Sequence, residues 1–278
     1  MGRAGGALAL AVQRAGVSVE QLIYRTEPAA ANGFDVQKLV SIDATEAIYS
    51  YILLIATSDQ DIRSTAQSLA GSAELPAVAL HLSGSLDSAE LSSLKEEGVA
   101  VGSMHPLVSI SDAKLGSTRF RGSYFCLEGD PAAVEAAKQL VDALGGLHFS
   151  IETRFKPLYH ASAVMASGNV TALFDAAIEM LSKCGVTHDR AQKILLPLLQ
   201  STVSNLADRT TKEALTGPFT RGDLGALSRH LDAFEGAVDE DIRSIYLDLA
   251  ERSVRLADGQ HAAELLEAIS IAKRKPRC

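Results

Sequence analysis

A lysine and a histidine lie four residues apart in the stretch KPLYHASAVMASGN, which begins at residue 156. Pro157 is typical of the first position of a helix, which makes Lys156 the predicted N-cap and places His160 one turn further on. At about 100° per residue, both side chains share one face of that helix. The positive end of the helix dipole would disfavour the lysine charge and lower its pKa, which suits a general acid.

The same face continues beyond this polar head with small and apolar residues. The stripe runs through Ala163, Ser167, Thr171, Phe174 and Ile178. The local sequence also allows a structural role for Lys156 and His160. In that case, the lysine lies at the surface with its stem packed on the protein, and the histidine is satisfied by a core hydrogen bond.

A glycine-rich loop opens the chain as MGRAGGALAL. In the dinucleotide-binding fingerprint G-x-G-x-x-G, such a loop follows a strand and begins the helix whose N–H groups hold the pyrophosphate. Gly2 fits the second glycine and Gly5 the third, with Arg3 and Ala4 between them. The first glycine and first strand would then precede Met1. A flexible N-terminus is the alternative.

The first strand of such a fold lies centrally in its sheet. Losing it would remove buried side chains worth about 5–15 kcal/mol in total, which is comparable with the stability of a whole domain. We therefore expect a strand ending in Gly-x upstream of residue 1.

The end of the next strand indicates the cofactor. NAD-binding folds place an acidic residue there for the ribose hydroxyls, whereas NADP-binding folds use arginine and hydroxyl side chains for the additional phosphate. The predicted strand 19–24 is followed by Arg25 and Thr26, which favours NADP. Glu27 is the acidic residue that argues for NAD, but it comes one or two positions late.

Polar residues also follow the later predicted strands, at the edge where ligands bind in an open α/β sheet. Thr57 and Ser58 follow the run YILLIA, and Ser58 could equally cap the next helix. The segment HLSGS contributes Ser83 and Gly84, and GSMHPL contributes His105. We expect these residues to bind the cofactor or the substrate.

A further polar segment, ALTGPFTRGD, is too rich in glycine, proline and threonine for a helix interior. Arg221 in this segment offers a planar fork for a carboxylate or phosphate, and Asp223 lies beside it. The segment predicts a substrate-binding loop. The alternative is an ordinary connection between helices with Asp223 as an N-cap.

Two kinds of secondary structure divide the chain. Apolar, β-rich runs occur at 19–24, 51–56, 77–82, 99–104, 124–128 and 148–152. Helical patterns lie between several of them, at 59–70, 88–97 and 131–144. Helical patterns alone follow, at 157–183, 188–209, 223–236, 239–257 and 261–272. This order predicts a doubly wound parallel sheet of the Rossmann-like α/β class, residues 1–152, and an all-helical domain, residues 153–278.

Composition narrows the functional classes. The chain has 278 residues, 47% of them apolar and 22% charged, which is typical of a globular protein without a membrane span. A net charge of −8 argues against nucleic-acid binding. The three cysteines are widely spaced, so that we expect neither disulfides nor a metal site, and expect a cytoplasmic protein. Hydrolase and kinase motifs are absent from the sequence.

Several motifs together resemble one bacterial protein family across essentially the whole chain. They are GRAGGALA, HLSGSL, GSMHPL, EGD at 128–130, KPLYHASAVMASGN and ALTGPFTRGD. The family comprises Rossmann-like NADP-dependent oxidoreductases of unassigned reaction with a C-terminal helical domain of unknown function. Its fold is similar to the 6-phosphogluconate dehydrogenase group, which includes β-hydroxyacid dehydrogenases, ketopantoate reductase and pyrroline-5-carboxylate reductase.

The resemblance implies roles for individual residues. In β-hydroxyacid dehydrogenases a Ser-Gly pair binds substrate, and a catalytic lysine is followed four residues later by asparagine. Ser83-Gly84 matches that pair and Lys156 matches the lysine, whereas His160 stands where asparagine is expected. The resemblance also implies a homodimer built on the helical domain.

These observations predict an NADP-dependent oxidoreductase that transfers hydride between the nicotinamide and a small keto or imino acid. Lys156 would donate the proton, His160 or His105 would orient the substrate, and Arg221 would bind its carboxylate, with Asp223 nearby. The alternative is a non-catalytic NADP-binding sensor, favoured by the missing asparagine. A third possibility is an inactive fragment of such an enzyme.

Overall fold

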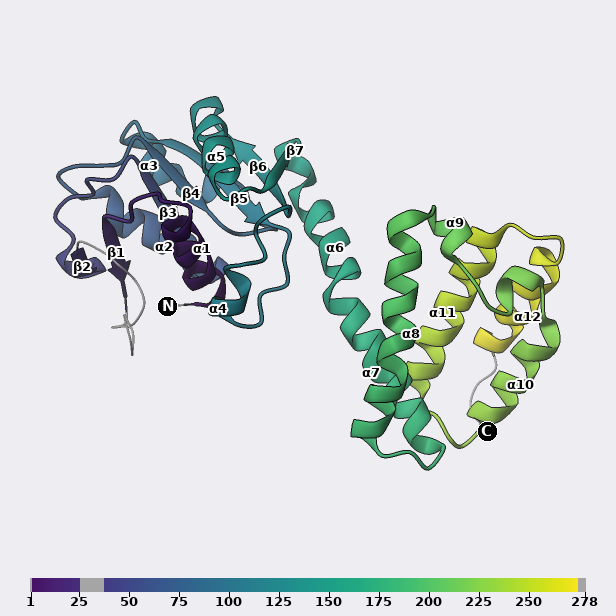
Figure 1. The fold of residues 1–278 in the computed structure, drawn as a ribbon. Helices are drawn as coiled ribbons and strands as arrows, with labels where there is room; N and C mark the ends of the chain where they lie inside the picture. The colour runs from purple at the N-terminus through teal and green to yellow at the C-terminus, as the bar shows by residue number, and fades with distance from the viewer. Residues whose placement is uncertain (1, 26–37, 275–278) are drawn as a thin grey trace. The chain divides into compact units, whose positions relative to one another are not determined.

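A computed structural model describes residues 2–25 and 38–274 of the chain (Figure 1). The chain divides into two compact units, Met1–Ser167 and Gly168–Cys278, which we describe separately. The sequence pattern predicts a boundary near residue 152, where the strands end. The first unit continues past that point through one more helix.

A five-stranded sheet forms the centre of the N-terminal unit, with the strand order β3-β4-β5-β6-β7. The strands are β3 (Ile52–Ile55), β4 (Val78–His81), β5 (Ala100–Pro106), β6 (Tyr124–Gly129) and β7 (Leu147–Ser150). Neighbouring strands are parallel except β5 and β6, which are antiparallel. The predicted Rossmann-like α/β class is confirmed, with this one reversal added to it.

Helices cover both faces of the sheet. They are α1 (Arg3–Arg14), α2 (Asp59–Ala70), α3 (Ser92–Glu96), α4 (Ala113–Gly116) and α5 (Pro131–Ala143). Because successive strand residues point to opposite faces, Val78 and Leu80 of β4 pack with α1 and α5, whereas Ala79 packs with α2 and α3. The short 3₁₀ helices of this unit are η1 (Ile42–Ala44), η2 (Ser88–Leu91) and η3 (Thr153–Phe155).

A second, two-stranded sheet consists of β1 (Gln21–Tyr24) and β2 (Lys38–Ser41), which run parallel. The first of these strands lies inside the predicted run 19–24. The second was not predicted, because its four residues KLVS give no clear alternation: two are exposed, one is buried and one is half-buried. In the part of the chain that the structure describes, these two strands do not pair with the five-stranded sheet.

The helix that carries Lys156 differs from the prediction in two ways. α6 (Lys156–Ala166) begins at Lys156 itself, and Phe155 is the N-cap, because the 3₁₀ turn η3 already makes the chain helical before the proline. The predicted single helix 157–183 is interrupted at Ser167, whose backbone leaves the helical region, before α7 (Gly168–Lys183) begins.

The C-terminal unit is entirely helical in the residues described. Besides α7 it contains α8 (His188–Asp208), α9 (Thr211–Ala214), α10 (Leu224–Phe234), α11 (Glu240–Ala257) and α12 (Ala262–Arg274), with a 3₁₀ turn η4 (Phe219–Arg221). Its larger core joins α10, α11 and α12 through residues such as Leu227, Leu247 and Ile269. The four helices predicted after residue 187 are confirmed as α8, α10, α11 and α12.

One helical stretch, Thr153–Lys183, is long and apolar enough to cross a membrane by length and composition, and only 6% of its most apolar window is buried. Leu158 and Met165 on this stretch are 69% and 68% exposed. Polar residues such as Ser162 and Asn169 interrupt this stretch, so that it contains no unbroken apolar run of that length.

Candidate active site

A block of polar side chains occupies one face of β5 and β6. Ser103 and Glu128 are register partners, and so are His105 and Cys126. The alternate residues of these strands, such as Met104, belong to the apolar core on the other face. The four polar side chains therefore point together toward the face that α1 and α5 do not cover.

Lys156 lies against this polar block and is completely buried. Its Nζ donates to the carbonyl oxygen of Ser83, at 3.0 Å, and to the Ser103 hydroxyl, at 2.6 Å. Burial is the main reason that the pKa of Lys156 is lowered, whereas nearby Glu128 opposes that change. The lowered pKa was predicted, but from the helix dipole, and the structure gives burial as the principal cause.

Two histidines and a tyrosine lie beside the lysine. The Tyr159 hydroxyl is 2.6 Å from Nδ1 of His105, and the rings of His105 and His160 are 5.9 Å apart in an edge-on arrangement. Burial lowers the pKa of His105 to about 4, with a smaller effect from Lys156. Burial also raises the pKa of Tyr159. At neutral pH both groups are uncharged.

Gly84 allows these imidazoles to approach the strand end. A Cβ atom on Gly84 would lie 2.5 Å from Cδ2 of His160 and 2.8 Å from Nε2 of His105. Any side chain at this position would therefore displace both rings. The predicted Ser83-Gly84 pair and the predicted residues Lys156, His105 and His160 lie together at one place in the N-terminal unit.

Hydrogen bonds fix the Ser83 loop. The Ser83 and Ser85 hydroxyls each donate to Oδ2 of Asp59 at 2.9 Å, which ties the loop after β4 to the start of α2. The Ser83 hydroxyl also accepts from the backbone N–H of Leu86, at 3.0 Å. Ser83 is buried, so that its carbonyl is held in place for Lys156.

The start of α1 has the features that a dinucleotide phosphate requires. Gly2 is the N-cap in an extended conformation, and no side chain caps the first turn. A Cβ on Gly5 would lie 2.8 Å from Cβ of Ala56, so that glycine permits the helix to approach the end of β3 closely. Arg3 and Ala4 lie between them. These residues fit an NADP pyrophosphate at the helix N-terminus.

Arg25 follows β1 and reaches the first turns of α2. Its guanidinium donates to Asp61 at 3.1 Å, to Ser64 at 3.3 Å and to Thr65 at 3.1 Å. The pair with Asp61 is solvent-exposed, so that a phosphate could replace the carboxylate at small cost. Thr26, the other predicted residue here, lies outside the described residues.

Thr57 and Ser58 lie exposed between β3 and α2. Ser58 occupies the N-cap position of α2, and its hydroxyl bonds to the Asp61 side chain rather than to a backbone N–H. The position of Ser58 is thus compatible with both predictions, namely that it caps α2 and that it lies at the edge of the sheet where ligands bind.

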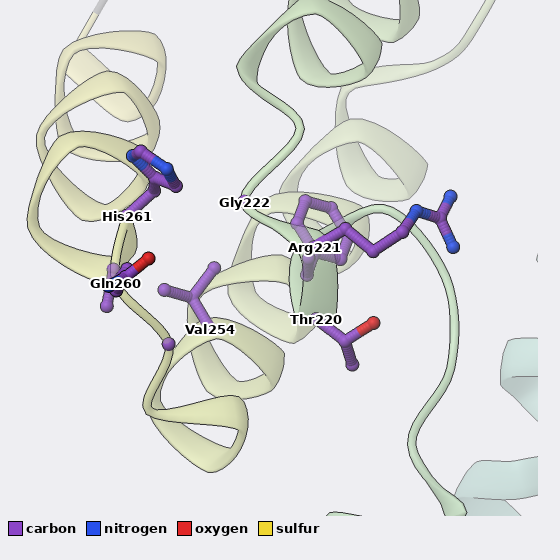
Figure 2. Close-up of a pocket in the computed structure, with 9 residues that line it drawn as sticks. Thr220, Arg221, Gly222, Val254, Gln260 and His261 are labelled. Atoms are coloured by element: carbon purple, nitrogen blue, oxygen red, sulfur yellow. The ribbon is translucent and has the colours of Figure 1, made fainter.

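Arg221 and Asp223 lie in the C-terminal unit. Arg221 ends η4 and lines a cavity of about 240 Å³ together with residues that include Thr220, Gln260 and His261. Figure 2 shows its side chain extending away from His261 and Gln260, and the residue is exposed. Asp223 caps α10, since Oδ1 accepts from the backbone N–H of Ala226 at 2.8 Å.

A family model described as a domain of unknown function, DUF2520, matches residues 123–253. A comparison of the sequence with curated proteins gives no match.

Solved structures share the fold of the whole chain. A candidate NADP oxidoreductase from Bacteroides fragilis superposes with a TM-score of 0.72 at 20% identity, covering 91% of this chain and 95% of that one. A protein from Thermotoga maritima has a TM-score of 0.68 at 19% identity, with 99% and 97% covered. Pyrroline carboxylate reductase from Plasmodium falciparum with NADP bound has a TM-score of 0.56 at 13% identity, with 92% and 95% covered. The predicted resemblance to Rossmann-like NADP oxidoreductases is confirmed at the level of fold.

Three residues of this site were not predicted from the sequence: Ser103, Glu128 and Tyr159. Glu128 and Tyr159 lie within the DUF2520 match, and Ser103 precedes it. A signal was available for two of them, because the strands GSMHP and FCLEG alternate polar with apolar residues. A charged residue at the end of such an apolar run marks either a solvated face or a buried site.

Proposed function

We propose that this chain is an NADP-dependent oxidoreductase that transfers hydride between the nicotinamide and a small keto or imino acid. The observation that carries the proposal is the burial of Lys156 beside Ser83, Ser103 and His105, at the ends of adjacent strands. Burying an ammonium group destabilises the folded protein unless hydrogen bonds or an opposite charge compensate it, so that such a group is often kept for a function. Two solved structures of similar fold, the candidate NADP oxidoreductase from Bacteroides fragilis and the Plasmodium falciparum reductase with NADP bound, support NADP as the cofactor.

The N-terminal unit would hold the cofactor through residues from several elements. Gly2, Arg3, Ala4 and Gly5 would hold the pyrophosphate, and Arg25 with Thr26 the 2′-phosphate. Thr57, Ser58 and Ser83 would line the rest of the site. When bound, the nicotinamide supplies or accepts the hydride, and the protein contributes position and charge.

The chain's own residues would manage the proton. Two of the three ammonium protons of Lys156 are donated to Ser83 and Ser103, which leaves the third for a substrate oxygen or nitrogen. In the tautomer in which Tyr159 donates to Nδ1, His105 would carry its proton on Nε2, the nitrogen beside Gly84. That N–H would orient the substrate atom that Lys156 protonates. His160 lies beside it and would bind the same substrate.

We assign recognition of the substrate carboxylate to Arg221, with Asp223 and Gly84 as further substrate contacts. The support is the exposed guanidinium, whose bidentate geometry matches a carboxylate. Asp223 also holds Arg221 indirectly, since it caps the helix that follows η4.

We infer that the chain forms a homodimer through the exposed apolar residues of α7 and α8. These include Leu173, Ile194, Leu198 and Val203. Apolar surface of this extent along neighbouring segments is typical of a protein interface. The unpaired cysteines Cys126 and Cys184 support a cytoplasmic location.

The test is NADPH oxidation by the purified protein with a panel of small keto and imino acids, followed by absorbance. We expect turnover with a member of the panel and weaker turnover with NADH. NADPH binding without turnover on any substrate would contradict the enzymatic role, and failure to bind either cofactor would contradict the dinucleotide site as well.

A further inference from the structure

Glu128 is a charged residue with no role in the reaction proposed above. It lies near the end of β6 and is only 4% exposed. A buried carboxylate is strongly destabilising unless hydrogen bonds and an opposite charge compensate it. Its neighbours therefore indicate why the fold keeps it there.

Neutral donors surround the carboxylate. Oε1 accepts from the hydroxyls of Ser88, at 2.7 Å, and Thr153, at 3.0 Å. Oε2 accepts from the backbone N–H of Ser88, at 3.1 Å, and from the Ser103 hydroxyl, at 3.0 Å. These four bonds satisfy the oxygens, but none of the donors carries a positive charge.

The positive charge lies one hydrogen bond further on. The Ser103 hydroxyl accepts from Nζ of Lys156 and donates its own proton to Oε2 of Glu128. Lys156 is likewise without a charged partner in direct contact among the described residues, since its acceptors are a carbonyl and this hydroxyl. One serine thus connects two buried, opposite charges.

We propose that Glu128, acting through Ser103, is the counter-charge that keeps buried Lys156 in its ammonium form. Glu128 is then a positioning residue, because it would not touch substrate. The inference rests on the proposed function for its purpose, since only a protonated lysine can donate a proton. The pairing itself is a property of the N-terminal unit alone.

Other ionisable groups face Lys156 from the packed strands and loops. They are Cys126 on β6, Asp59 on α2, Asp87 before η2, His81 on β4 and His105 on β5. Glu128 has the largest opposing effect on the pKa of Lys156, after the lowering caused by burial. His81 and His105 have lowered pKa values and are neutral at pH 7.

The experiment measures the protonation of Lys156 directly, in the full-length protein without cofactor or substrate. The protein is labelled with [ε-¹³C]lysine, and the Lys156 resonance is assigned by its loss in Lys156→Arg. The ¹³Cε shift is then followed against pH in the wild type and in Glu128→Gln, which keeps the shape of the side chain. An opposite charge at this range favours the charged form by about 1 to 3 pH units, so that the midpoint should fall by that amount.

Two further variants sharpen the result. Ser103→Ala removes the bridge, and we expect a smaller fall in the same direction; this variant decides the question if Glu128→Gln does not fold. Glu152→Gln removes an exposed carboxylate, paired with Arg154 just before α6, and should leave the midpoint unchanged. A midpoint equal to that of the wild type in the folded variants would overturn the proposal.

The outcome is separable from that of the proposed reaction. A fall of the midpoint without turnover on any keto or imino acid would support Glu128 as the counter-charge of Lys156 and contradict the proposed reaction. Turnover that requires Lys156, together with an unchanged midpoint in Glu128→Gln, would support the proposed reaction and contradict the role of Glu128 as counter-charge. If both hold, Glu128→Gln should also shift the basic limb of the pH–rate profile to lower pH.

Discussion

The two units of the chain differ in where their buried polar groups lie. Among the described residues, the buried polar and charged side chains, such as Lys156, Glu128 and His81, all lie in the N-terminal unit. The C-terminal unit has large exposed apolar side chains, such as Leu198 and Val203, without a buried polar group beside them among its described residues. Burying a charge and exposing apolar surface both cost stability. The first cost indicates a site for chemistry, and the second indicates a surface for association.

The largest expected effect is the loss of turnover when Lys156 in the N-terminal unit is replaced. Lys156→Ala should lower kcat by about 10²–10⁴-fold or more, because it removes the proposed proton donor, while NADPH affinity stays near that of the wild type. Steady-state kinetics with a substrate from the panel and a cofactor titration measure the two quantities. Lys138→Ala, an exposed lysine on α5, is the matched control. Unchanged kcat would remove Lys156 from the mechanism.

The second effect concerns association through the C-terminal unit. Leu198 is 66% exposed, and Leu198→Glu would place a charge inside the proposed interface, at a cost of several kcal/mol. Light scattering on an eluting sample should show the mass change from two chains to one. Gln192→Glu, an exposed position on the same helix, should remain dimeric. A single-chain mass for the wild type would contradict the interface assignment.

The third effect tests the buried histidine beside Lys156. The pKa of His105 is about 4 in the folded chain, below its usual 6.5. The unfolded chain therefore binds more protons between these pH values, and the free energy of unfolding should fall as pH drops from 6.5 toward 4. The contribution is at most about 3 kcal/mol.

His105→Asn keeps an acceptor near the Tyr159 hydroxyl but removes the titration, so that this dependence should flatten. Urea unfolding followed by circular dichroism at several pH values measures it. His81 contributes in the same direction in both proteins, because burial lowers its pKa as well. An equal slope in the variant and the wild type would show that His105 is not a buried neutral group.

The smallest expected effect concerns cofactor choice. Arg25→Ala should weaken NADPH binding by about 10- to 100-fold, the value of a charge-assisted hydrogen bond to phosphate, and leave NADH binding unchanged. Arg63→Ala on α2, where the exposed arginine pairs with Glu90, is the control. Equal losses for the two cofactors in Arg25→Ala would place the 2′-phosphate elsewhere.

Local patterns in the sequence sufficed for most of the elements, because strands such as VALH are buried and mostly apolar and helices such as α2 carry strong periodicity. They did not suffice for β2, which is short and only partly buried, or for the reversal between β5 and β6. Antiparallel pairing of these two strands depends on contacts between distant segments rather than on local propensity. The break between α6 and α7 at Ser167 was likewise not predicted, because no proline near this residue marks the end of a helix.

The candidate site was predictable where a residue type carries its own chemistry. Lys156, His105, His160 and the Ser83-Gly84 pair stood out and are found together. Glu128 gained no role, because its meaning depends on Ser103, its register partner 25 residues earlier. A buried charge pair joined through a hydroxyl becomes visible only when two strands are aligned.

The long connections of Lys156 also affect the order of folding. Its two acceptors lie 73 and 53 residues before it in the sequence, and the bonds of Glu128 to Ser88 span 40. Contacts of such separation form late, since each requires closure of a long loop. During synthesis, β4, β5 and β6 all leave the ribosome before Lys156 does. The ammonium group is thus synthesised after both of its hydrogen-bond acceptors and after Glu128.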